Sequence, residues 1–492
     1  MSSSISARLA ARHHQRDYTP LSWSEYFDEV HDITSKDAIQ SIDSSWHEPV
    51  PLDEGDSFRV YLRNFREPFA PKRKFGQKIT DANQLGDISN ANLNKYSQIP
   101  TLVLLHGGGY SGLTWASFTR HIEQIYQCRI LAIDLRAHGD TKTTDEERMD
   151  IDTLVKDTIA VTQIVHQICG FPQLPKLVLV GHSMGGTIAV KSAVKCNQYL
   201  PSLAGFVVID VVEGTAKDAL PLMMSVLKTR PSKFTSLNNA IEWAVRSGMT
   251  KNPDSARVSM PGNLINVETG QLAIHDVPVQ EYKIDNYSFI QRHKFHISLE
   301  NLISTTSVSS RIVPPAGLPL PPRVNALRQD LNRPVLMEEP DTAGKNQTDS
   351  SLEERGESGD RQCPDTDQSS TDVSPQISID DDGYKRPPDV KDSTGYCWRA
   401  NLSKTQPFWN GWFDGLSADL LEAPVQGKFL LLAGIDRLDK TLTIGQMQGK
   451  FMMKVLPKCG HAVHEDVPGQ VASVIGQFLI RNKFTNAVNT DE

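Results

Sequence analysis

The sequence has few cysteines and no long apolar run. Six cysteines occur in 492 residues, and no two form a C-x-x-C pair, so the zinc and dithiol redox motifs built on such pairs are absent. Six cysteines are too few to form a disulfide framework in a chain of this length. Their scarcity favours reduced thiols in a cytoplasmic or nuclear protein. No stretch approaches the roughly 18 consecutive apolar residues of a membrane-spanning helix, so we expect no membrane partner.

The sequence also lacks the concentration of positive charge that nucleic-acid binding requires. The chain has a formal net charge of −8. Residues 338–382 hold 14 acidic and 3 basic side chains, which leaves a net charge of +3 for all other residues. The acidity therefore belongs to one segment, and no part of the sequence has the basic character of a nucleic-acid-binding domain.

Six apolar segments alternate with helical patterns along the chain. Near-continuous apolar strands in such an alternation are typical of a parallel sheet covered by helices on both faces, an α/β fold. Helical patterns lie near 151–169, after Met184 and over 467–481, and the aromatic segments LSWSEYF and FRVYLRNF between 17 and 65 are expected to form the first strands. The apolar segments are PTLVLLHGGG, CRILAIDLRAHG, PKLVLVGHS, LAGFVVID, KFLLLAGID and FMMKVLPKCGH.

A long excursion separates the fourth and fifth apolar segments. Residues 216–260 have helical patterns, among them SLNNAIEWAVRSG, which begins at a possible serine cap and ends at a glycine. We expect a helical cap over about 216–300. Residues 304–391 hold one aromatic residue, Tyr384, and are rich in Ser, Pro, Asp and Glu. Such a segment cannot bury enough apolar surface to offset its chain entropy, so we expect a disordered acidic insert.

The expected organisation follows from these segments. The core comprises residues 17–303 and 392–484, interrupted by the insert over 304–391 and followed by a short tail over 485–492. Residues 1–16 form an N-terminal tail that we expect to be disordered. This tail is basic and rich in Ser and Ala, a composition that a transit peptide shares.

The segment VLVGHSMGG places a serine between glycines. GHSMG matches G-x-S-x-G with Ser183 at its centre, directly after an apolar strand and before a helical pattern. This context predicts a nucleophile elbow, a sharp turn that exposes a reactive hydroxyl at the carboxyl end of the sheet. The alternative is an ordinary glycine-containing turn. Glycines on both sides permit the tight turn and close packing of strand on helix.

A serine nucleophile needs backbone donors for the negatively charged oxygen of its tetrahedral intermediate. The loop LLHGGGYSG resembles the glycine loop that supplies such donors in esterases. The predicted donors are the amides of Gly108, or a neighbouring glycine, and of Met184, the residue after the serine. A glycine turn that only permits close approach of chain segments is the alternative.

The base and the acid should follow the serine along the chain, in the order Ser, acid, His. KCGHAVHED offers His461, directly after the last strand, as the base and His464 as the alternative. The acid would orient the imidazole and stabilise its protonated form. Asp210 and Asp436 each end an apolar strand, and position alone does not decide between them. Asp134 is expected to shape its own turn.

The sequence resembles the protein phosphatase methylesterases, a family of α/β-hydrolases. The shared stretches cover most of residues 17–303 and 394–484. IDVVEGTA and DRLDKTLTIGQMQGK are far more specific than a serine motif. The shared stretches include DYTPLSWSEYF, LLHGGGYSGLTWASFT, CRILAIDLRAHGDTK, GHSMGGTIAVKSA, VVIDVVEGTAKDAL, SLNNAIEWAVRSG, SARVSMPG, WFDGLS, LLLAGIDRLDKTLTIGQMQGKFMM and LPKCGHAVHEDVP.

The resemblance implies an α/β-hydrolase fold and a serine esterase. The family removes the methyl ester from the C-terminal leucine of the type 2A protein phosphatase catalytic subunit, so that subunit would be both substrate and partner of a chain that is otherwise a monomer. Carried over, Ser183 is the nucleophile, His461 the base and Asp210 the acid, which decides against Asp436. The resemblance implies no metal or organic cofactor. Another small-ester hydrolase and a non-catalytic phosphatase-binding scaffold are the alternative functions.

Overall fold

The computed structural model describes residues 16–38, 50–65, 99–171, 173–195, 199–279, 394–434 and 438–487. They fall within one unit of the chain, Met1–Lys294 and Lys391–Glu492. The predicted insert over 304–391 and nearly all of the predicted N-terminal tail lie outside the described residues, as do the last part of the predicted cap and Asp436.

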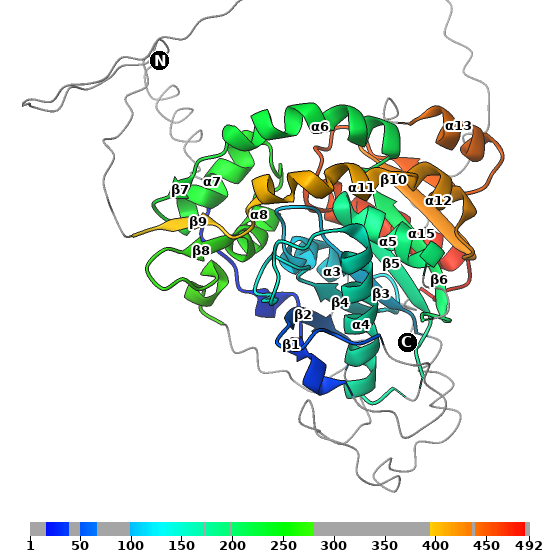
Figure 1. Ribbon diagram of the computed structural model, residues 1–492, viewed down its shortest axis with the longest axis horizontal. Helices are drawn as coiled ribbons and strands as arrows, with labels where there is room; N and C mark the ends of the chain where they lie inside the picture. The colour runs from blue at the N-terminus through cyan, green and yellow to red at the C-terminus, as the bar shows by residue number, and fades with distance from the viewer. Residues whose placement is uncertain are drawn as a thin grey trace, which may run out of the picture. The chain divides into compact units, whose positions relative to one another are not determined.

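A large, mostly parallel sheet forms the centre of the described fold (Figure 1). Its strands are β1 (Glu29–Thr34), β2 (Ser57–Arg63), β3 (Thr101–Leu105), β4 (Arg129–Ile133), β5 (Leu177–His182), β6 (Leu203–Ile209), β10 (Gly427–Leu432) and β11 (Met452–Val455). The order across the sheet is β1-β2-β4-β3-β5-β6-β10-β11. β2 is antiparallel to β1 and β4, and the other neighbours are parallel. The predicted α/β architecture is confirmed, and each of the six apolar segments contains a strand.

The first aromatic segment differs from the prediction. LSWSEYF does not form a strand, because Trp23–Glu25 folds into a short 3-10 helix. The side chain of Ser22 accepts a hydrogen bond from the backbone N–H of Ser24, which stabilises this turn. The first strand, β1, follows it, and the second aromatic segment contains β2 as expected.

Helices cover both faces of the sheet (Figure 1). In β3, Leu102 and Leu104 pack in one apolar cluster with side chains of α3 and α15, while Val103 and Leu105 pack in a second cluster with α4, α5, α11 and α12. This alternation is the two-residue period of a strand buried on both faces. The helices are α3 (Ala116–Ile122), α4 (Ile151–Ile168), α5 (Met184–Lys195), α11 (Trp409–Phe413), α12 (Leu416–Glu422), α13 (Lys440–Met447), α14 (Val463–Asp466) and α15 (Pro468–Arg481).

The excursion after β6 is helical, as predicted, and contains α6 (Glu213–Lys228), α7 (Leu237–Ser247) and α8 (Pro253–Ser259). Ser236 caps α7 by accepting a hydrogen bond from the N–H of Asn239, and Gly248 ends the helix in a left-handed conformation. A small sheet of order β7-β9-β8 joins this cap and was not predicted. Its strands are β7 (Lys233–Phe234), β8 (Leu264–Asn266) and β9 (Tyr396–Trp398). Among the described residues no helix combines the length and apolar character needed to cross a membrane.

Candidate active site

Ser183 sits on a sharp turn between β5 and α5. Its φ of 52° is positive, which is unusual for a residue with a side chain and stores strain. Its backbone N–H donates to the carbonyl oxygen of Ile209 at 3.0 Å. The flanking glycines make the turn possible, because a Cβ on Gly181 would lie 2.0 Å from the carbonyl oxygen of Gly185, and a Cβ on Gly185 would lie 2.2 Å from that of Leu105. The serine is therefore held at the carboxyl end of the sheet by local geometry.

The neighbouring strand β6 places Asp210 beside His461. Asp210 follows β6 with a φ of 54°, and its Oδ2 lies 2.9 Å from His461 Nδ1. Its other oxygen, Oδ1, accepts a hydrogen bond from the N–H of Ala433 at 3.0 Å. The carboxylate is fully buried, whereas the imidazole is 47% exposed. A buried, oriented carboxylate on one ring nitrogen leaves the other, Nε2, for proton transfer.

Two further side chains hold the loop that carries His461. His182 Nε2 lies 2.9 Å from the backbone oxygen of His461, and the two rings are 4.6 Å apart between centroids. Burial lowers the pKa of His182 well below its usual value, so the neutral ring donates through Nε2 to that oxygen. Asp466 accepts the N–H of Gly460 at 2.5 Å and the N–H of Lys251, in the cap, at 2.6 Å. The loop that carries His461 is thus hydrogen-bonded to His182, next to Ser183, and through Asp466 to Lys251 in the cap.

The glycine loop after β3 approaches the elbow closely. A Cβ on Gly107 would lie 3.2 Å from the Cβ of Ser183, so the loop passes next to the serine. The N–H of Gly109 donates to His138 Nε2 at 2.8 Å. Burial lowers the pKa of His138 to about 4, so this ring is neutral and can accept. Gly108, a predicted oxyanion donor, lies between these two anchored glycines.

Met184, the second predicted donor, is the first residue of α5. The N–H groups of a helix's first turn have no carbonyl partner within that helix, and the positive end of the helix dipole favours negative charge there. The amide of Met184 is therefore free of intrahelical bonding and follows the serine directly. Both predicted donors belong to segments that border Ser183.

The sequence also offered His464 as an alternative base and Asp436 as an alternative acid. His464 is buried, and its Nε2 lies 2.9 Å from the hydroxyl of Thr114. Burial lowers its pKa to about 3, so it is a poor proton acceptor at neutral pH. Asp436 lies outside the described residues. Asp134 shapes its own turn, as expected, by accepting the N–H of Asp140, and it also accepts the N–H of Gly112 in the glycine loop.

Similarity to known proteins identifies the family. The model of the alpha/beta hydrolase family matches residues 102–265 and 361–474. Proteins of Mus musculus and Homo sapiens, both named protein phosphatase methylesterase 1, are each 36% identical to this chain over 475 residues, which cover 96% of this chain and 88% of each relative. A Schizosaccharomyces pombe protein of the same name is 30% identical over 416 residues, covering 83% of this chain and 84% of its own.

This chain belongs to the protein phosphatase methylesterase family. It is an enzyme of the alpha/beta hydrolase type, an ester hydrolase. In this methylesterase the serine, the carboxylate and the imidazole come from the ends of three different strands, which the parallel sheet collects at one edge. That arrangement suits acyl transfer, because it gathers a hydroxyl, an oriented imidazole and backbone donors in one place.

Several residues of this edge could not be singled out from the sequence of the methylesterase. His182 is the variable position of G-x-S-x-G, and His138 lies in a segment with no catalytic pattern. Asp466 ends KCGHAVHED, in which only the two histidines were candidates. Tyr110, in the glycine loop, is buried with its ring 5.5 Å from that of His182, edge to face. Apart from the hydrogen bond between Asp466 and Gly460, their contacts connect segments far apart in the chain, so no local pattern reveals them.

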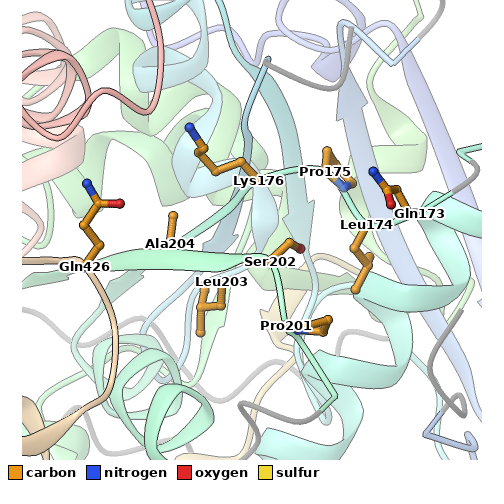
Figure 2. A pocket seen from close by; sticks show the side chains of 9 residues that line it. All are labelled: Gln173, Leu174, Pro175, Lys176, Pro201, Ser202, Leu203, Ala204 and Gln426. Carbon is orange, nitrogen blue, oxygen red and sulfur yellow. The ribbon is translucent and has the colours of Figure 1, made fainter. Parts of the chain in front are cut away.

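One recess in the part of the chain that the structure describes lies away from the candidate site. It has a volume of about 410 Å³ and lies at the amino-terminal ends of β5 and β6, opposite Ser183. Figure 2 shows Lys176, Leu203 and Gln426 among the side chains that line it. Within the described ranges, no group of three or more His, Cys, Asp and Glu side chains is placed to hold a metal ion.

Proposed function

We propose that this methylesterase hydrolyses the methyl ester of the C-terminal leucine of the type 2A protein phosphatase catalytic subunit. The relatives' shared name, protein phosphatase methylesterase, supports a phosphatase substrate. The observation that carries the proposal is the pair of Asp210 and His461, 2.9 Å apart, at the sheet edge where the strained turn holds Ser183. The cytoplasmic or nuclear location stays a prediction from the sequence.

The proposed reaction has two acyl-transfer steps. The oxygen of Ser183 attacks the ester carbonyl, and His461 Nε2 takes the serine proton while Nδ1–H donates to Asp210. The amides of Gly108 and Met184 stabilise the negatively charged oxygen of the tetrahedral intermediate. Collapse of the intermediate breaks the bond to the methoxy group, which leaves as methanol with the proton from His461. Water, deprotonated by the same imidazole, then attacks the acyl-serine and releases the carboxylate.

The helix that follows Asp210 presents a surface suited to contact with a large folded partner. Helix α6 begins three residues after Asp210, crosses the top of the molecule in Figure 1, and has no fully buried residue. Leu222 and Val226 are 65% and 54% exposed, and their spacing of four residues places them on one face of the helix. One methyl group discriminates poorly between esters, so contacts away from the ester with such a surface support selectivity for a protein substrate.

Hydrolysis of purified methylated phosphatase tests this proposal. The loss of the methyl group is followed by mass spectrometry, and a short activated ester and a methylated tail peptide are assayed in parallel. We expect kcat/KM for the intact phosphatase to exceed that for the peptide by about a hundredfold, which corresponds to about 3 kcal/mol of transition-state binding. Turnover of small esters without demethylation of the phosphatase would favour a general esterase. Binding without hydrolysis of any ester would favour a scaffold.

A further inference from the structure

One arginine beside the glycine loop has no counter-charge among the residues that the structure describes. Arg230 follows α6 and is half-buried, yet it makes no ion pair or side-chain hydrogen bond within the described segments. Burial lowers its pKa because the guanidinium loses hydration, although an arginine remains charged. Five other covered arginines each contact at least one carboxylate, namely Arg59, Arg63, Arg136, Arg257 and Arg399, and the buried Arg129 donates to the backbone oxygen of Ile99.

Arg230 is held in place by an aromatic cluster. Its guanidinium carbon lies 5.1 Å from the ring centroid of Trp398, a cation–π contact. The indole N–H of Trp398 donates to the backbone oxygen of Pro231 at 2.8 Å, which fixes the ring against the segment that carries the arginine. Trp398 in turn packs on Phe234 and Trp243, each with a centroid distance of 5.5 Å. These contacts orient the guanidinium, and none of its N–H groups donates to a residue that the structure describes.

The guanidinium borders the candidate site. Nη1 of Arg230 lies 3.4 Å from the position that a Cβ on Gly109 would take. Gly107, two residues earlier, lies against Ser183, as described above, and two residues span at most about 7 Å. Ser183 and Arg230 therefore flank the same short glycine loop, and a ligand bound at the serine reaches the arginine within one or two residues of peptide.

We propose that Arg230 forms a carboxylate-binding subsite at the rim of the Ser183 site. The planar, forked guanidinium matches the two oxygens of a carboxylate, and a partly desolvated cation gains more from such a partner than a hydrated one. The inference rests on the proposed function, because a peptide substrate supplies the anion. The carboxylate comes either from the C-terminus that demethylation releases or from an acidic side chain just before it.

Two pairs of peptides distinguish these sources. The first pair ends in leucine methyl ester and carries Glu or Gln before the leucine, and kcat/KM is measured. The second pair ends in a free leucine carboxylate or its carboxamide, and each peptide competes with fluorophosphonate labelling of Ser183. The proteins are wild type, Arg230→Met, Arg230→Lys and the control Arg246→Met. Arg246 is exposed on α7 and pairs with Glu242 of the same helix, so its loss leaves the rim untouched.

The expected result is a preference for the anionic peptide of at least one pair by about tenfold in wild type, the size of a charge-assisted hydrogen bond. Arg230→Met should lose that preference, Arg230→Lys should keep part of it, and Arg246→Met should keep all of it. The pair that responds identifies the carboxylate. The subsite would be overturned if Arg230→Met kept the wild-type preference for the anionic peptide. It would also be overturned if wild type showed no preference in either pair.

The controls separate this inference from the proposed function. Thermal melts show whether each variant folds, and Arg230→Lys carries the comparison if the methionine variant does not. The labelling competition reports peptide binding without requiring ester turnover. Failure of the wild type to demethylate the phosphatase would therefore refute the proposed function, while the competition with free carboxylate would still report on Arg230.

Discussion

Replacing Asp210 with asparagine should disable the proposed reaction while keeping the shape of the site. The two carboxylate oxygens have different partners. Oδ1 accepts the backbone N–H of Ala433 at 3.0 Å, and Oδ2 lies 2.9 Å from His461 Nδ1. Because a backbone N–H can only donate, the amide oxygen of the asparagine must stay on the Ala433 side. The amide NH₂ group then faces the imidazole.

This orientation forces the wrong tautomer on the base. Facing an NH₂ donor, His461 Nδ1 must accept, so the ring proton moves to Nε2 and the imidazole can no longer take the proton of Ser183. Substitutions of this kind in serine-histidine-aspartate enzymes lower kcat by about 10⁴-fold, which corresponds to about 5 kcal/mol of transition-state stabilisation. We expect a loss of similar size for Asp210→Asn, because the carboxylate is fully buried and no solvent replaces it.

The assay is demethylation of the phosphatase by wild type, Asp210→Asn and Asp436→Asn, with thermal melts of all three. Asp436 is the matched control because it also follows an apolar strand in the sequence. We expect the Asp436 variant to stay near wild-type turnover. An Asp210 variant within about tenfold of wild type, or a folded Asp436 variant with the larger loss, would refute the assignment of the acid.

Three other predictions concern the elbow, a buried acid and the insert. Gly185→Ala should lower stability by about 1–3 kcal/mol or more in denaturant unfolding, because the new Cβ would lie 2.2 Å from the Leu105 carbonyl oxygen; an unchanged midpoint would contradict this steric argument. Burial raises the pKa of Glu465 to about 7, so the folded state keeps a proton that the unfolded chain loses, and stability falls as pH rises towards 7 by on the order of 3 kcal/mol. Glu465→Gln should therefore gain stability relative to wild type as the pH rises from 4.5 to about 7, and parallel pH profiles of the two proteins would count against it. Replacing residues 304–391 with a short Gly/Ser linker should preserve the melting temperature and turnover, because loop-closure entropy changes slowly with length; lost turnover in a folded protein would assign the segment a role in the reaction.

Much of the fold could be predicted because its signals are local. The apolar runs that become β3 to β6 and β10 are strands buried on both faces, and the run that becomes β11 forms a half-buried strand at the edge of the sheet. The elbow was predictable for the same reason, since Gly181, Ser183 and Gly185 form one turn. Strand β9 was not, because three residues after a long polar segment become a strand only through pairing with β7 and β8.

The contacts that complete the site could not be predicted from periodicity or spacing. Asp210 and Asp436 each follow an apolar strand, so residue patterns alone could not decide which of them is the acid. The resemblance to the methylesterases favoured Asp210. In the structure, 251 residues separate the two members of the Asp210–His461 pair. The position of Arg230 could not be predicted from the sequence either, because it depends on a contact with Trp398. The strand of Trp398 follows the long excursion.

The measurement that tests the central claim most directly is the demethylation rate of purified methylated phosphatase with Ser183→Ala, compared with wild type. Removing the hydroxyl removes the proposed nucleophile and adds no bulk at the elbow, so the variant should fold and bind. We expect turnover to fall by about 10⁴-fold or more, to the residual level that backbone donors and binding provide, with no fluorophosphonate labelling. A folded Ser183→Ala protein that demethylates the phosphatase near the wild-type rate would contradict the account.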